Sequence, residues 1–266
     1  MPHNLSHFSF QFPPCKERHY NSTLSLWLSV DPMSDKYPGL SPYTYCANNP
    51  VRLVDPDGRK IWVGNYYYRN GNLYDKNDKV FIPDQDSFEG KALQSLNVLY
   101  GTEQGYALLN PLIDNDGKNV YIKNASERKD KQGMSGWGND MVQLQSGEVI
   151  EGTIYWNPDG VGVLTTAGFT ANATTDLGHE FSHAFDDFFG YVYVIDQYEE
   201  LSTMEWMAVY RENLIRRELG APYREYYGYI EEPNYWYPSI RDRVPKGPYM
   251  LKDGKPYFPE EYLKKQ

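Results

Sequence analysis

The sequence predicts an α+β fold, because segments with helical periodicity and segments typical of β-strands both occur along its 266 residues. One observation is a pair of histidines four residues apart, His179 and His183, in a stretch whose apolar residues follow helical spacing. Another is a longer stretch, residues 199–219, with apolar residues three and four apart. The third is a series of tyrosine-rich and β-branched runs bounded by turn signals, which indicate hairpins.

The segment before the histidine pair predicts a hairpin and two helices. Residues 61–85 alternate tyrosines with turn signals, and Asn70-Gly71 is a strong signal for a tight hairpin. Residues 88–113 carry helical periodicity, which Gly101 and Gly105 divide into two pieces. We therefore expect a β-hairpin followed by two consecutive helices.

Two further runs predict strands, at residues 120–122 and 149–156. Residues 148–156 are also a candidate edge strand that holds an extended substrate beside a catalytic site, although the pattern by itself favours an ordinary hairpin. The tail from residue 226 onward is rich in Tyr, Pro and Lys. We expect it to wrap the domain as irregular structure without a chemical role.

Charge and composition argue against two classes of function. The chain has 26 basic and 36 acidic residues and a net charge of −10, which argues against a nucleic-acid-binding surface. No run of 18 apolar residues occurs, so no membrane span is expected. The first residues do not resemble a Sec signal peptide, so export would use another route. Cys15 and Cys46 do not make a disulfide framework.

The segment 179–183 reads His-Glu-Phe-Ser-His, the pattern H-E-x-x-H. Histidines four apart lie one turn apart on one helix face, so both rings can reach a single Zn²⁺. Glu180 can then take a proton from a water that the metal holds. In a chain of this length the pattern arises by chance less than about once in a hundred. The alternative is a core helix that carries two histidines without metal.

The surrounding residues predict the limits of this helix. N-cap oxygens are available on Thr174, Thr175 and Asp176, and Gly190 is a plausible end. Apolar residues fall at helical spacing between these limits: Leu177, Phe181, Ala184, Phe185 and Phe188. The motif therefore lies on a buried helix of about four turns.

The third ligand has to be a carboxylate. The other three histidines lie at positions 3, 7 and 19, and Phe189 stands where a third histidine six residues past His183 would be. Glu205 and Glu212 both fall on the apolar face of the predicted 199–219 helix, where a carboxylate is costly unless it is paired or metal-bound. They lie about 10.5 Å apart along the helix, so only one can bind the ion. The other can orient a ligand histidine.

Two aspartates follow the motif directly. Asp186 and Asp187 lie too near His183 in the sequence to be good ligands. Each can instead hydrogen-bond within its own helix or support a ligand from outside the metal shell.

Residues 18–58 closely resemble the C-terminal end of the Rhs-repeat core of Rhs and YD-repeat polymorphic toxins. The matching pieces are residues 19–20, 27–32, 43–50 and 54–58. The resemblance implies that a variable toxin cassette follows, with an Rhs cage and a cognate immunity protein as partners. Asp31 and Asp55 each precede a proline, and we interpret them as turn residues.

The metal helix, residues 179–187, is similar to that of anthrax lethal factor, a gluzincin. Residues 205–208 are similar to its glutamate-ligand helix, which implies that Glu205 is the third ligand. Tyr198 falls where that family has a tyrosine that stabilises the oxyanion, with Tyr193 and Tyr210 as competitors. Residues 205–224 also resemble NleD-type effector peptidases, although Val209 replaces the family's acidic residue four positions past the ligand.

Together these features predict three parts: an Rhs-core remnant at 1–58, a β-hairpin connector at 59–85 and a zincin-like metallopeptidase domain at 86–266. We expect a Zn²⁺-dependent endopeptidase toxin that acts on a target protein after export by a non-Sec route. The expected roles are as follows: ligands His179, His183 and Glu205; catalytic Glu180 and Tyr198; supporting Asp187 and Glu212. The alternatives are a zincin-fold cassette that only binds, and a structural Rhs tip protein.

Overall fold

The computed structural model divides the chain into two compact units, Met1–Pro56 and Asp57–Gln266, and each is described by itself. In the first unit, β1 (Tyr20–Asn21) pairs with β2 (Leu26–Trp27). Most of the stretch that resembles the Rhs core lies outside the described residues. The described residues are 20–21, 26–27, 60–113, 119–128, 133–138, 141–143, 149–189, 197–198, 201–237 and 239–259.

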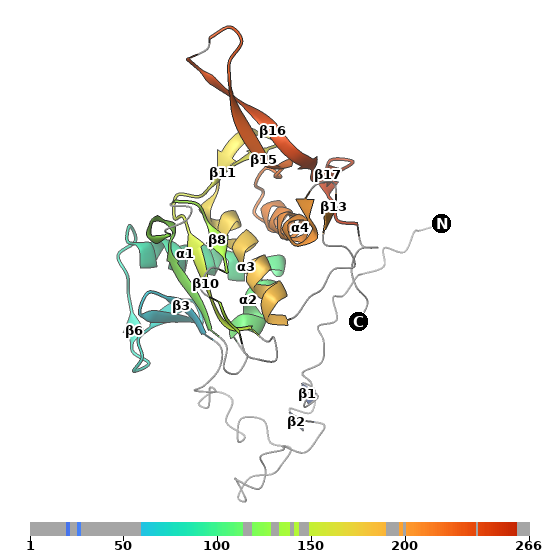
Figure 1. The fold of residues 1–266 in the computed structure, drawn as a ribbon. Coiled ribbons are helices and arrows are strands. Elements are labelled where there is room, and N and C mark those ends of the chain that lie inside the picture. The colour runs from blue at the N-terminus through green and yellow to red at the C-terminus, as the bar shows by residue number, and fades with distance from the viewer. Residues whose placement is uncertain are drawn as a thin grey trace, which may run out of the picture. The chain divides into compact units, whose positions relative to one another are not determined.

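The second unit is built on an eight-stranded sheet with the order β6-β5-β4-β3-β7-β10-β8, in which β9 also pairs with β10 (Figure 1). Strands β3, β7 and β10 run parallel at its centre, and the outer strands pair antiparallel. The strands are β3 (Lys60–Val63), β4 (Tyr66–Arg69), β5 (Asn72–Tyr74), β6 (Val80–Phe81), β7 (Asn119–Asn124), β8 (Gly136–Trp137), β9 (Val142–Gln143) and β10 (Val149–Trp156).

The hairpin predicted around Asn70-Gly71 is confirmed as β4 and β5. Asn70 has φ 49° and Gly71 has φ 79°, the two left-handed residues that a two-residue hairpin turn requires. The sequence predicts residues 59–85 as a connector, whereas the strands that they form are part of the sheet. Their four strands belong to the central sheet, and Ile61 and Leu73 are fully buried in its core.

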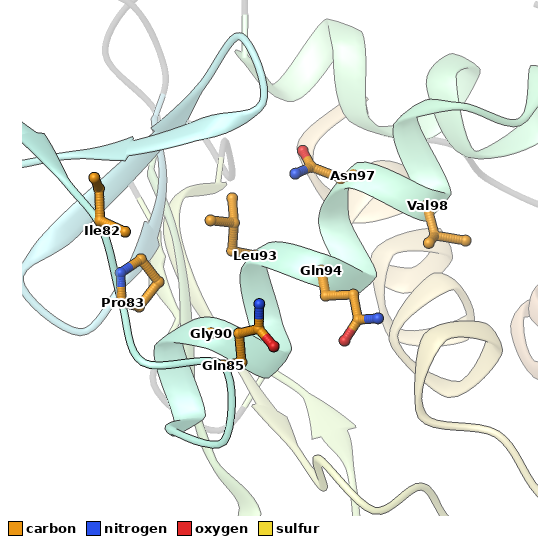
Figure 2. Close-up of a pocket in the computed structure, with 8 residues that line it drawn as sticks. All are labelled: Ile82, Pro83, Gln85, Gly90, Leu93, Gln94, Asn97 and Val98. Carbon is orange, nitrogen blue, oxygen red and sulfur yellow. The ribbon is translucent and has the colours of Figure 1, made fainter.

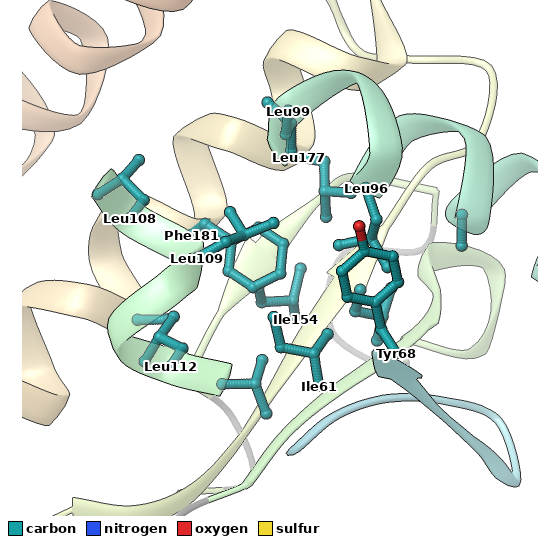
Figure 3. Close-up of a cluster of buried hydrophobic side chains, with 14 of the residues drawn as sticks. Ile61, Tyr68, Leu96, Leu99, Leu108, Leu109, Leu112, Ile154, Leu177 and Phe181 are labelled. Carbon is teal, nitrogen blue, oxygen red and sulfur yellow. The ribbon is translucent and has the colours of Figure 1, made fainter. Parts of the chain in front are cut away.

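Helices α1 (Phe88–Tyr100), α2 (Glu103–Ile113) and α3 (Ala173–Phe189) pack against the sheet and against one another. Ser87 caps α1 by accepting a hydrogen bond from the Gly90 amide. The break between α1 and α2 falls at Gly101 as predicted, whereas Gly105 lies inside α2. Figure 3 shows the core, in which Ile61 and Ile154 of the sheet meet Leu96, Leu109 and Phe181 of the three helices.

The strand at 149–156 is confirmed, but the expectation that it forms a sheet edge is wrong. Strand β10 pairs with β7 on one side and with β8 and β9 on the other. Its backbone hydrogen bonds are thus used by neighbouring strands over much of its length. An extended substrate therefore cannot add to it as a new strand along this length.

The helix with the histidine pair has a different cap from the one expected. Asn172 accepts a hydrogen bond from the Thr175 amide at 3.1 Å, so Asn172 is the N-cap and Thr174–Asp176 lie inside the first turn. The helix ends at Phe189, immediately before Gly190.

The helix predicted at 199–219 is shorter at its start. Helix α4 (Thr203–Glu218) begins after the N-cap Ser202, and the preceding residues form β13 (Gln197–Tyr198) and β14 (Leu201–Ser202). Gly220 ends it with φ 65°, the conformation that glycine adopts readily. Glu205 therefore lies in the first turn of α4.

The expectation that the tail is irregular is wrong. Strands β15 (Tyr226–Pro233) and β16 (Arg241–Tyr249) form a long antiparallel hairpin (Figure 1). Residues next to β15 also hydrogen-bond to the hairpin of β11 (Gly162–Thr165) and β12 (Gly168–Ala171), through the Glu225 amide and Leu164 carbonyl at 3.0 Å. The short strands β17 (Leu251–Lys252) and β18 (Lys255–Pro256) follow.

Within the described residues, no helix is both long enough and apolar enough to span a membrane.

The boundary between the units leads to a prediction about fragments. Residues 57–266 are expected to unfold cooperatively by themselves, because the unit has its own core. A fragment of residues 86–266 is expected to lack cooperative unfolding, because it loses four strands and the buried side chains of Ile61, Val63 and Leu73. Thermal unfolding followed by circular dichroism measures both. A cooperative transition in fragment 86–266 would contradict this account of the sheet.

Candidate metal centre

Helices α3 and α4 bring the site together. His179 and His183 lie one turn apart on α3, and Glu205 lies in the first turn of α4. The two helices pack closely at Gly178, where a Cβ would lie 2.7 Å from Ile215 Cδ1 and 3.2 Å from Leu99 Cδ2. A larger residue would force α3 and Ile215 of α4 apart, so this glycine allows α4 to approach beside His179.

The three side chains predicted as ligands converge on one point. His179 Nε2 and His183 Nε2 are 3.3 Å apart, and Glu205 Oε2 lies 3.3 Å and 3.2 Å from them respectively. These residues could hold a metal ion. The His179 side chain is 8% exposed and that of His183 11%, so both rings are largely shielded from water, while Glu205 is more open at 30%.

The charges at this point call for a cation. Among the described residues, Glu205 Oε2 is buried and lacks a hydrogen-bond partner. A neutral His179 that donates from Nδ1 to Glu212 presents a lone pair at Nε2, so nitrogen and oxygen lone pairs face each other across 3.3 Å. Burial alone would lower the pKa of His179, but the Glu205 and Glu212 carboxylates outweigh it and raise the pKa to about 10.

Glu212 contacts Nδ1 of His179, the ring nitrogen that does not face the three converging atoms. Its Oε2 atom lies 3.2 Å from His179 Nδ1, which fixes the tautomer that leaves Nε2 free to bind an ion. Arg216 Nε donates to Oε1 at 2.8 Å, and Arg224 Nη1 donates to Oε2 at 2.9 Å. Burial would raise the pKa of Glu212, but the two arginines and His179 hold it well below its usual range. The sequence predicts this supporting role, but not the contact with Arg224.

Glu180 is buried beside the three converging atoms. Burial raises its pKa above the usual range, while the charges of His179 and His183 act in the opposite direction. Asp176, one turn earlier on α3, is half-buried and accepts a hydrogen bond from the Ser135 hydroxyl. Burial and the Glu180 charge raise the pKa of Asp176 to about 7. The sequence suggested Asp176 only as a cap, so its contact with Ser135 was missed.

The two aspartates after the motif have different partners. Asp186 is buried and pairs with Arg211 of α4, whose Nη1 donates to Oδ1 at 2.7 Å and to Ser182 Oγ at 2.8 Å. Asp187 accepts a hydrogen bond from the Trp137 indole at 2.6 Å, and the His183 charge lowers its pKa against the larger effect of burial. Asp187 therefore ties α3 to β8.

The role expected for Tyr198 stays a prediction. The Tyr198 side chain and all of Tyr193 lie outside the described residues, and Tyr210 packs near Phe258 with ring centres 6.1 Å apart. Tyr227 of β15 instead interacts with the Glu205 carboxylate. Burial raises the pKa of Tyr227 to about 12, with further contributions from the charge of Glu205 and a hydrogen bond with it.

Arg224 and Tyr227 are thus the site residues that the sequence analysis missed. Tyr227 lies at the start of the tail, to which it assigned no chemical role, and Arg224 lies just before the tail. Arg224 falls at the end of the stretch that resembles effector peptidases, which was the available signal.

A hollow of about 590 Å³ lies on a different part of the unit, between α1 and the segment after β6 (Figure 2). Its lining includes Ile82, Pro83, Leu93 and Val98 with the amides Gln94 and Asn97, and it contains no histidine or carboxylate. It therefore lacks the groups for metal binding or acid–base chemistry.

Comparison with known proteins does not assign a family, and the functional argument depends on the geometry above. No family model, curated protein or solved structure matches this chain.

Proposed function

We propose that the chain is a Zn²⁺-dependent endopeptidase. The observation that supports this most is the triangle of His179 Nε2, His183 Nε2 and Glu205 Oε2, with sides of 3.2 to 3.3 Å. Ligands of a tetrahedral zinc with bonds of about 2.0–2.1 Å lie about 3.3–3.4 Å from one another. The three atoms therefore have the spacing of three corners of a zinc tetrahedron.

The chemistry of the donors also fits zinc. Two imidazoles and one carboxylate suit zinc better than calcium or magnesium, which prefer oxygen ligands. The buried Glu205 Oε2, without a hydrogen-bond partner in the described residues, gains one strong interaction when an ion binds. Three protein ligands leave a fourth position open, which is typical of catalytic rather than structural zinc.

Zinc bound at this site would supply Lewis acidity, which polarises a peptide carbonyl and lowers the pKa of water. Glu180, buried next to the ligands, accepts the proton of the attacking water and passes it to the leaving amine. Glu212 holds His179 in the required tautomer. The side chains of this chain thus provide ligands, general base and orientation for peptide hydrolysis.

The wider role that we propose is that of a toxin cassette. Its support is the resemblance of residues 18–58 to the end of an Rhs core, together with the local likeness of the metal site to effector peptidases. A cassette of this kind acts on a target protein after export by a non-Sec route. An Rhs cage and a cognate immunity protein would be its partners.

Purified protein is expected to carry about one zinc per chain after expression with added zinc, because a preformed three-ligand site binds the ion tightly. His179→Ala and His183→Ala should each lose most of it. Elemental analysis by mass spectrometry measures the ratio, with His19→Ala, in the other unit, as the matched control. Near-zero zinc in the parent protein would exclude the enzyme and leave a cassette that acts by binding or as structure.

A further inference from the structure

We propose that the tip of the β15–β16 hairpin binds the protein substrate at a place remote from the bond that is cut. The hairpin tip consists of four exposed apolar residues, Tyr235, Trp236, Tyr237 and Ile240, which enter an apolar cleft of the folded target protein. This inference rests on the proposed peptidase function. It predicts a preference for the intact target over a short peptide with the same cleavage sequence.

The hairpin tip exposes far more apolar surface than a solvated turn needs. Tyr235 is 84% exposed, Trp236 79%, Tyr237 66% and Ile240 54%. Turns usually carry small and polar residues, whereas each Trp or Tyr buries about 150–250 Å² when a partner covers it. Large apolar side chains gathered at one exposed place indicate an interaction site.

The turn that carries these residues is held by its own hydrogen bonds. Asn234 Oδ1 accepts from the Trp236 amide at 2.9 Å and from the Tyr237 amide at 2.8 Å. Asn234 Nδ2 donates to Asp242 Oδ2 at 2.7 Å, and the Asn234 backbone amide donates to the Ile240 carbonyl at 2.8 Å. The hairpin tip is thus formed before binding, so binding through it costs less conformational entropy than ordering a flexible loop.

The other end of the hairpin is fixed to the metal centre. Arg224, just before β15, donates from Nη1 to Glu212 Oε2 at 2.9 Å, and that oxygen lies 3.2 Å from His179 Nδ1. The same guanidinium donates to the backbone carbonyls of Tyr226 and Tyr227 at the start of β15. A protein bound at the metal centre therefore has the hairpin beside it.

The length of β15 sets how far the hairpin tip lies from the metal centre. A strand rises about 3.3 Å per residue, so the part of β15 from Tyr227 to Pro233 spans about 20 Å. Figure 1 shows the hairpin extending away from the helices of this unit. A folded protein is large enough to reach both places, whereas a peptide of about eight residues extends only about 14 Å on either side of a central bond.

The strands between the two ends are poor partners for an added strand. Pro233 of β15 and Pro245 of β16 have no backbone N–H, and prolines keep edge strands from pairing. Glu231 and Arg243 lie opposite each other and pair at 3.4 Å. Recognition is therefore left to the side chains of the hairpin tip, and the matching surface on the target is a cleft that buries aromatic rings.

Charge and composition favour a protein over a lipid surface as the occupant. The acidic and basic residues of the hairpin balance: Glu231, Glu232 and Asp242 against Arg241, Arg243 and Lys246. The hairpin thus lacks the basic excess that attracts anionic lipid, and the whole chain carries a net charge of −10. Trp, Tyr and Arg, which this end of the hairpin combines, are the residues that most often dominate the binding energy of protein interfaces.

The test compares Trp236→Ala with the parent on two substrates. One is the intact target, identified as a protein that the parent cleaves in a proteome and that Glu180→Gln, without the general base, does not. The other is a synthetic peptide of about eight residues around the cleaved bond. Trp236→Ala should raise KM for the intact target by about 30-fold, the effect of losing a dominant interface residue, and leave kcat unchanged. Its zinc content and both constants for the peptide should match those of the parent.

The matched control is Tyr106→Ala, because Tyr106 is an aromatic residue with 46% exposure that lies on α2 rather than on the hairpin. It should match the parent on both substrates. A second measurement does not depend on turnover. Glu180→Gln should bind the intact target in titration calorimetry, and the addition of Trp236→Ala should weaken that binding by about the same factor as KM.

The outcomes separate this inference from the proposed function. A parent that binds zinc and cleaves its target, with unchanged KM in Trp236→Ala, would overturn the role of the hairpin tip alone. An equal loss on the peptide would also overturn it, because the hairpin tip would then act on the reaction site. Binding of the parent to phosphatidylcholine vesicles that Trp236→Ala loses, with KM for the target unchanged, would assign the hairpin tip to a lipid surface instead. A parent without zinc and without cleavage would overturn both proposals.

Discussion

Replacing Glu180 with Gln is expected to abolish peptide hydrolysis while the protein stays folded and keeps its zinc. The amide has nearly the same shape as the carboxylate but cannot accept the proton of the attacking water. Glu180 is buried and is not one of the three converging ligand residues, so the change leaves their geometry intact. Loss of a general base typically costs about 10²–10⁴ in rate. New peptide termini, identified by mass spectrometry after incubation with a proteome, measure the activity.

The control for this change is Glu232→Gln, which removes the same charge from an exposed position on β15. It should retain the activity and the zinc content of the parent. Cleavage by Glu180→Gln within about tenfold of the parent, less than a general base usually contributes, would show that Glu180 does not serve as the base.

The parts of the site that could be predicted from the sequence are those set by local geometry. His179 and His183 lie on one helix face because four residues make about one turn, whatever the rest of the chain does. The turn at Asn70-Gly71 follows in the same way from the backbone conformations that these residues accept. Such features depend on a few consecutive residues, so a pattern is sufficient to identify them.

The parts that could not be predicted depend on pairings far apart in the sequence. Lys60 pairs with Asn119 in the parallel ladder of β3 and β7, which draws the expected connector into the central sheet. Arg224 reaches Glu212 only because the chain reverses after Gly220 and returns along α4. No local pattern near Arg224 or Tyr227 indicates that return, and Tyr227 is one of 25 tyrosines in the whole chain.

The sequence predicts only in part which of Glu205 and Glu212 faces the two histidines. Both fall on the packed side of α4, and the sequence places them seven residues apart without showing which one meets the histidine Nε2 atoms. The packing of α3 against α4 determines which glutamate reaches these atoms. Glu205 lies 3.2 Å and 3.3 Å from the two Nε2 atoms, whereas Glu212 lies against Nδ1 of His179 and two arginines.

Glu205→Gln and Glu212→Gln are therefore expected to have opposite rankings in zinc affinity and in stability. Glu205→Gln removes an anionic ligand and should weaken zinc binding by orders of magnitude. Glu212→Gln leaves the three ligand atoms in place and should weaken it by about 10–100-fold, the usual effect of a group that orients a ligand. Competition with a chelating dye at fixed pH measures both affinities.

In the metal-free protein, Glu212→Gln should be the more damaging of the two variants, as judged by the unfolding temperature. Glu205 pairs with His179, which keeps the Glu212 carboxylate as a partner when Glu205 is neutralised, so Glu205→Gln should lower the unfolding temperature less than Glu212→Gln. Glu212 neutralises two arginines whose side chains are 2% and 11% exposed, and its loss leaves buried charge uncompensated, at a cost of about 3–5 kcal/mol. Thermal unfolding in excess chelator measures this. Weaker zinc binding in Glu212→Gln than in Glu205→Gln, with a lower unfolding temperature in Glu205→Gln, would reverse the assignment of the third ligand.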